Sequence, residues 1–119
     1  MSSAASSLIA SLQGSQDPDA RVLLQMLELG ANLARPHRPE FAFDMPSLET
    51  AEGITQALEA SGWLTECFGP DDDNPDFLVI ARREMLLDLA VLNDLSRRFE
   101  ALAATHGGVY DGWGAEIVE

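Results

Sequence analysis

Apolar residues recur at helical spacing in three parts of the chain, each preceded by a residue that caps helix N-termini. The clearest start is Asp17-Pro18, because aspartate is a favoured N-cap and proline is tolerated at the first helical position. A glycine follows each stretch, as is common where a helix ends. We therefore predict helices over residues 18–29, 48–61 and 89–106, with N-caps at Asp17, Ser47 and Asp88.

Apolar and polar residues alternate in other parts of the chain, which is typical of strands. The first such segment places Phe41, Phe43 and Met45 on one face. The turn-rich residues 69–75 separate the next two segments and predict a hairpin between them. The strands predicted in this way cover residues 40–45, 63–68 and 77–82.

The final segment, residues 109–119, predicts a fourth strand with an irregularity. Gly112 and Gly114 flank Trp113, and glycine inside a strand indicates a bulge or a close approach of backbones. The rings of Tyr110 and Trp113 then have two interpretations. They pack between helix and sheet, or they are aromatic anchors for a partner.

The order of these elements predicts an α+β fold. After one extra N-terminal helix come strand, helix, strand, strand, helix and strand, the order of a ferredoxin-like split βαβ sandwich with a four-stranded sheet and two core helices on one face. The first helix, Pro18 to Leu29, is apolar on more than one side, so it should cover an edge of the sheet or contact a second subunit in a homo-oligomer. Residues 17–119 form a single predicted domain, and the serine- and alanine-rich residues 1–16 a mobile arm.

Charge narrows the possible partners. The 119 residues include 20 acidic and only 7 basic ones, all arginine, giving a net charge of -13 that would repel a nucleic-acid backbone and favour a basic protein surface. No secretory signal or membrane span is evident, so we expect a cytoplasmic protein with no membrane partner. The single cysteine, Cys67, lies in an apolar strand and is predicted to be a packed, inert thiol.

Four aspartates in the predicted hairpin connection, Asp71, Asp72, Asp73 and Asp76, form the densest acidic group. They do not match a calcium loop that starts at Asp71, because Asp76 stands where glycine is required and Arg82 where glutamate is required. A solvated turn, or a contact surface for a basic partner, explains them better. His37 and His106 have no metal-ligand spacing, and no catalytic triad or phosphate loop is present, so no catalytic, cofactor or metal residue is predicted.

Several segments together resemble one family. The most specific is Tyr110-Asp-Gly-Trp-Gly114, and residues 33–36, 87–93 and 102–107 also look like family features. On these segments the chain resembles, over about residues 17–119, the RraB-like or ribonuclease E inhibitor family, named after regulator of ribonuclease E activity B. It differs from the founding member in its N-terminal region and in stopping at Glu119 without an acidic tail.

The resemblance implies a ferredoxin-like fold and a non-catalytic regulator of RNA turnover that binds ribonuclease E at its scaffold part. Together with the charge, it predicts binding to ribonuclease E or another basic protein through Asp71, Asp72, Asp73, Asp76, Tyr110 and Trp113. Two alternatives stay open. One is a small-molecule-binding or catalytic domain that uses the sheet face beneath the first helix, and the other is a homo-oligomeric scaffold.

Overall fold

A computed structural model of the chain describes residues 16–119, and its elements follow the predicted order. The α+β class, the four-stranded sheet and the extra N-terminal helix are confirmed. The proposed mobile arm, residues 1–16, lies outside the described residues except for Gln16. The helices are α2 (Pro18–Glu28), α3 (Leu48–Ala60) and α4 (Leu89–Thr105), and the strands are β1 (Glu40–Met45), β2 (Leu64–Phe68), β3 (Phe77–Arg82) and β4 (Val109–Gly114).

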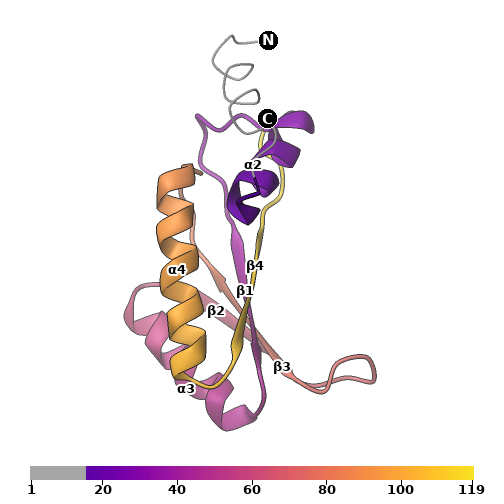
Figure 1. The fold of residues 1–119 in the computed structure, drawn as a ribbon, viewed down its shortest axis with the longest axis vertical. Helices are drawn as coiled ribbons and strands as arrows, with labels where there is room; N and C mark the ends of the chain where they lie inside the picture. Colours follow the sequence, from indigo (N-terminus) through magenta and orange to yellow (C-terminus); the bar gives the residue numbers. More distant parts are fainter. Residues whose placement is uncertain (1–15) are drawn as a thin grey trace.

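The sheet has the strand order β2-β3-β1-β4, with every neighbouring pair antiparallel (Figure 1). Helix α3 connects β1 to β2, which lie on either side of β3, and α4 connects β3 to β4, which lie on either side of β1. Each helix therefore bridges two strands across a third, which is the split βαβ arrangement. The two central strands are β3 and β1, and β2 and β4 form the edges.

The helix ends form where local chemistry predicts them. The Asp17 carboxylate accepts a hydrogen bond from the Asp19 amide, and the Asp88 carboxylate accepts from the Ala90 and Val91 amides. Ser47 and the side chain of Thr50 form a reciprocal capping box. These side chains satisfy amide groups that have no partner inside the helix, so each fixes the residue at which its helix begins.

The core lies between the helices and one face of the sheet. Phe41, Phe43 and Met45 are fully buried, which confirms the predicted alternation along β1. On α4, Phe99 stacks edge-on against Phe41 and Phe43 at centroid distances of 5.1 and 5.2 Å. It also contacts the rings of Trp63 and Tyr110. A single side chain of α4 therefore joins a central strand, an edge strand and the residue that precedes β2.

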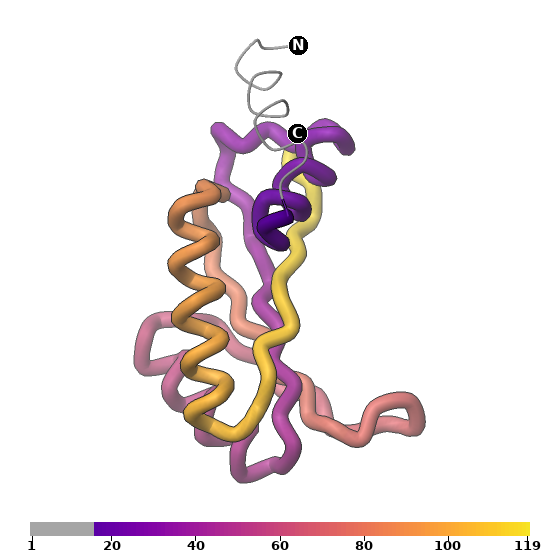
Figure 2. The backbone as a smooth tube through the Cα atoms, in the orientation of Figure 1, coloured from indigo at the N-terminus to yellow at the C-terminus, as the bar shows by residue number. Residues whose placement is uncertain are grey.

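Helix α2 packs on the same side, against α4 and above the end of β4 (Figures 1 and 2). Its residues Ala20, Leu23, Met26 and Leu27 are buried within the chain. After β4, the chain runs back toward α2, where the Asn32 amide donates to the carbonyl of Val118. The buried residues of α2 thus belong to the core of the chain, and the helix packs against α4.

The prediction that Cys67 is a packed thiol is wrong, because this residue is exposed. It lies on β2, an edge strand with a neighbour on one side only. The predicted strand over 63–68 also begins one residue later, at Leu64. Trp63 is instead a buried residue of the preceding turn, with the guanidinium of Arg83 4.0 Å above its ring.

Phe99→Ala is expected to lower the free energy of unfolding by about 3–5 kcal/mol, because a fully packed phenylalanine leaves a cavity where several rings meet. Urea unfolding followed by circular dichroism measures the change. Leu86→Ala is the control, since Leu86 is 55% exposed and its truncation should change stability by less than about 0.5 kcal/mol. Equal losses in the two variants would contradict this role of Phe99.

Candidate functional site

The segment Tyr110–Gly114 contains a bulge, as the sequence predicts. Phe41 pairs with Trp113 and Phe43 pairs with Tyr110, so β4 has one residue more than β1 between these pairs. Gly112 lies in the bulge with a φ of +94°, a conformation that side-chain-bearing residues rarely adopt. Gly114 has no such requirement and no close neighbour, so the expected close approach there is not found. The bulge lets both rings point to the same face of the sheet.

That face is the one covered by the helices, and Trp113 is tied to α2 there. Its indole Nε1 donates to Asp19 Oδ1 over 2.8 Å, and the Ser96 hydroxyl donates to the same oxygen over 2.9 Å. Asp19 is only 6% exposed, so these charge-assisted bonds offset the cost of burying its carboxylate. The bonds connect β4, α4 and α2 at one point.

Tyr110 packs its ring against Phe43 and Phe99. Burial raises the pKa of its hydroxyl above the ordinary tyrosine value, and the negative charges of Asp19 and Glu100 act in the same direction. Ser96 acts in the opposite direction and partly offsets this increase in the pKa. Within residues 16–119, no group lies in position for a well-formed hydrogen bond to the Tyr110 hydroxyl. The geometry of both rings thus supports the packing interpretation, and a direct contact with a partner stays a prediction.

The four candidate aspartates lie in the long connection between β2 and β3, which projects from the body of the molecule (Figure 2). Asp71 Oδ1 accepts from the amides of Asp73 and Asn74, at 2.9 and 2.8 Å, and Asn74 Oδ1 accepts from the amide of Asp76. Asp71 therefore builds the turn. Asp72 and Asp73 are exposed on its outside, where they concentrate negative charge.

This acidic connection continues onto the sheet. Burial raises the pKa of Asp44 on β1 above its usual range, and repulsion from Asp111 and Asp76 adds to the increase, while a hydrogen bond from Asn74 opposes it. Asp111 belongs to the bulge of β4 and Asp76 to the projecting connection. Carboxylates from three separate parts of the sequence thus create one region of negative potential.

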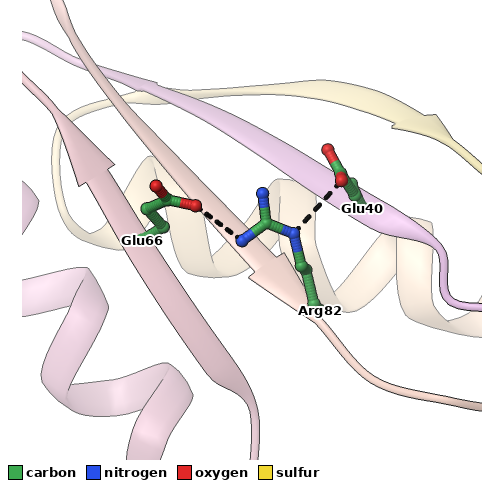
Figure 3. Close-up of polar contacts among 3 residues, drawn as sticks. All are labelled: Glu40, Glu66 and Arg82. Carbon is green, nitrogen blue, oxygen red and sulfur yellow. Dashed lines mark hydrogen bonds and ion pairs between the residues drawn. The ribbon is translucent and has the colours of Figure 1, made fainter.

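Asp44 faces away from the helices, on the sheet surface that no helix within residues 16–119 covers. On the same surface, Arg82 of β3 binds Glu40 of β1 at 3.1 Å and Glu66 of β2 at 2.7 Å (Figure 3). Hydrogen bonds that the Arg82 guanidinium donates to Glu66 and Glu40 raise its pKa. On α4, Arg97 and Arg98 both contact Asp94.

Residues 16–119 form clefts beside β4 and beside the start of β1. One of about 500 Å³ lies on the uncovered face beside the β4 bulge. Another, of about 570 Å³, lies between the start of α2, α4 and β4, where Asp19, Ser96 and Tyr110 converge. A third, of about 540 Å³, lies beside His37 and Arg82. Within residues 16–119, no three His, Cys, Asp or Glu side chains lie together in a way that could hold a metal ion.

The model of one protein family, described as Regulator of ribonuclease activity B (RraB), matches residues 16–115. The chain belongs to the RraB family. This match covers both the bulge of β4 and the acidic connection, so the residues discussed above lie within the family domain. Among curated proteins, no sequence gives a significant match to the chain. Within residues 16–119, no helix of this RraB-family protein is both long and apolar enough to cross a bilayer.

Sequence reasoning missed two residues of this RraB domain. Asp19 carries the bonds to Trp113 and Ser96, although 94 residues separate it from Trp113. His37 is fully buried, with Nδ1 3.0 Å from the carbonyl of Arg35 and Nε2 accepting from the Val118 amide at 3.1 Å. An aspartate inside the first turn of an apolar helix was the available signal for Asp19. His37 gave no signal, because its partners are backbone groups that any sequence supplies.

The bond between Trp113 and Asp19 is testable with a double-mutant cycle. Trp113→Phe and Asp19→Ala are expected to couple by about 1–3 kcal/mol in the free energy of unfolding, since each removes one partner of a buried charge-assisted hydrogen bond. Chemical denaturation of the four proteins gives the coupling. The pair Trp63→Phe and Asp19→Ala is the control and should couple by less than about 0.5 kcal/mol. Zero coupling for the Trp113 pair would show that the bond contributes nothing to stability.

The raised pKa of Asp44 predicts that the stability of the folded protein depends on pH. Its raised pKa means that folding disfavours the ionised form, so the destabilisation is present at neutral pH and is lost as pH falls through the folded-state pKa. Asp44→Asn should therefore be more stable than wild type at pH 7, and the difference should shrink toward pH 4. Thermal unfolding across this range measures it. Glu52→Gln, which removes an exposed carboxylate of α3, is the control.

Proposed function

We propose that this RraB-family protein is a non-catalytic regulator that binds ribonuclease E and so modulates RNA turnover. The family description, a regulator of ribonuclease activity, is the observation that carries the proposal, because it requires action on a ribonuclease. A ribonuclease that handles RNA needs basic surfaces. A partner with a net charge of -13 is suited to meet such a surface.

The acidic connection between β2 and β3 is the proposed first contact. Its aspartates stand out from the fold, and Asp72 and Asp73 are not needed to build the turn, because Asp71 and Asn74 supply its hydrogen bonds. Charges in this position accelerate encounter with a basic surface and are sensitive to salt. Tyr110 and Trp113 flank the bulge of β4 that contains Asp111.

A small-molecule-binding role is the second candidate. The cleft between α2, α4 and β4 favours it, because the Asp19 carboxylate and the hydroxyls of Ser96 and Tyr110 converge there. Thermal-shift screening against a panel of metabolites tests this role. If no compound stabilises the protein, the role is excluded.

A homo-oligomeric scaffold, predicted to form through the Pro18–Leu29 helix, is tested by light scattering. A monomer at all concentrations would exclude it.

Asp72→Asn combined with Asp73→Asn should weaken binding to purified ribonuclease E by roughly threefold to tenfold at low salt and by less at high salt, because rim charges act mainly on association. Biolayer interferometry at two salt concentrations measures both effects. The double variant keeps Asp71 and therefore the turn.

Glu28→Gln combined with Glu52→Gln is the matched control, since it removes two exposed carboxylates of α2 and α3 and alters net charge equally. Equal weakening by both variants would mean that overall charge matters and the connection does not. If wild-type protein does not bind ribonuclease E at either salt concentration, this choice of partner is wrong.

A further inference from the structure

The uncovered face of the sheet departs from the usual pattern of a solvated surface. An antiparallel sheet with one free face normally turns polar side chains outward. The register shows which residues of β1, β2 and β3 point outward here: Glu40, Ala42, Asp44, Leu64, Glu66, Phe68, Leu78, Ile80 and Arg82. Five of these nine side chains are apolar. Val109 of β4 joins them, because it pairs with Asp44.

These apolar side chains form an ordered row. Phe68 pairs with Leu78, Leu78 with Asp44, and Asp44 with Val109, so one row crosses all four strands and is interrupted only by Asp44. Phe68 is 44% exposed and Val109 63% exposed. Leu64 lies in another row of the same face, beside Arg82 and Glu40, and is also 63% exposed. Exposed apolar side chains that gather on one face indicate an interaction surface more than scattered ones do.

The net charge on this face is negative. It carries three carboxylates, those of Glu40, Asp44 and Glu66, and one cation, Arg82. The Arg82 guanidinium is already bound by Glu40 and Glu66. Asp111 and Asp76 border Asp44 and add to the negative potential. The apolar row therefore lies at the end of the sheet that adjoins the acidic connection.

We propose that this face, defined by Leu64, Phe68, Leu78 and Val109 with its carboxylate border, is the docking surface for a basic segment that carries apolar side chains. The inference rests on the proposed function, in which that segment belongs to the regulated ribonuclease. Four strands about 4.8 Å apart give a surface about 14 Å wide, enough for one helix of about 10 Å diameter. Arginine or lysine side chains of the segment reach the carboxylates while its apolar side chains cover the row.

Charge complementarity selects this occupant over a second copy of the same chain. A second copy would bring the same carboxylates to the interface and add a net charge of -13 to an equal one. Like charges placed opposite each other oppose association. The acidic connection brings the basic segment close, and the apolar row then holds it.

The test compares two pairs of substitutions with matched exposure. Leu64→Ser combined with Phe68→Ser alters the proposed surface. Leu29→Ser combined with Val91→Ser alters residues that are 63% and 47% exposed at the end of α2 and on α4. The first pair should weaken binding to ribonuclease E at least about tenfold, as expected when apolar contacts of an interface centre are removed, and the second pair less than about twofold. Circular dichroism verifies that both remain folded.

A second probe separates the surface from the partner. A synthetic amphipathic peptide of leucine and arginine should protect backbone amides of β2, β3 and β1 in hydrogen exchange, whereas a leucine and glutamine peptide of the same length should not. Binding of the arginine peptide to this face without binding of ribonuclease E would uphold the surface and refute the proposed partner. Binding of ribonuclease E that is unaffected by the Leu64 and Phe68 substitutions would overturn the surface and leave the proposed function standing.

Two further outcomes also overturn the inference. One is protection by the arginine peptide that avoids these strands. The other is a wild-type dimer in sedimentation that the Leu64 and Phe68 substitutions dissociate, because a second copy would then be the occupant.

Discussion

The contact of Phe99 with the covered face of the sheet is the interaction on which the rest of the fold depends. Its ring lies against rings from β1, β4 and the turn before β2, so α4 is fixed to both halves of the sheet through one side chain. Because α4 holds this position, Ser96, one turn earlier, reaches Asp19 and α2 is held as well. Packing around one aromatic residue thus places the N-terminal helix, the sheet and the bulge of β4.

The described helices all lie on one side of the sheet, so one face packs the core and the other is the proposed recognition surface. Tyr110 and Trp113 belong to the first, because the extra residue of the bulge turns both toward the helices. The second face combines exposed apolar side chains with carboxylates, a mixture that adds little to folding because those side chains are only partly removed from water. The acidic connection extends this free face outward (Figure 2).

Local signals in the sequence predicted much of the fold. The caps at Asp17, Ser47 and Asp88 and the bulge at Gly112 are confirmed, since each depends on hydrogen bonds or backbone angles within a few residues. The sequence also singled out the aspartates of the projecting connection as a group. It did not reveal the outward apolar row, because Phe68, Leu78 and Val109 come from three strands and meet only through their register.

The amino-acid sequence by itself determined the type and order of the elements, the family resemblance and the acidic character, because these follow from local periodicity, short motifs and composition. Tertiary structure alone decided which aromatic rings are buried, that Asp19 binds Trp113, and that Cys67 is exposed on an edge strand. It also brought Asp44, Asp76 and Asp111 together. Burial and charge repulsion depend on distances in space, and those distances arise only when strands far apart in the chain pair and helices cover one side.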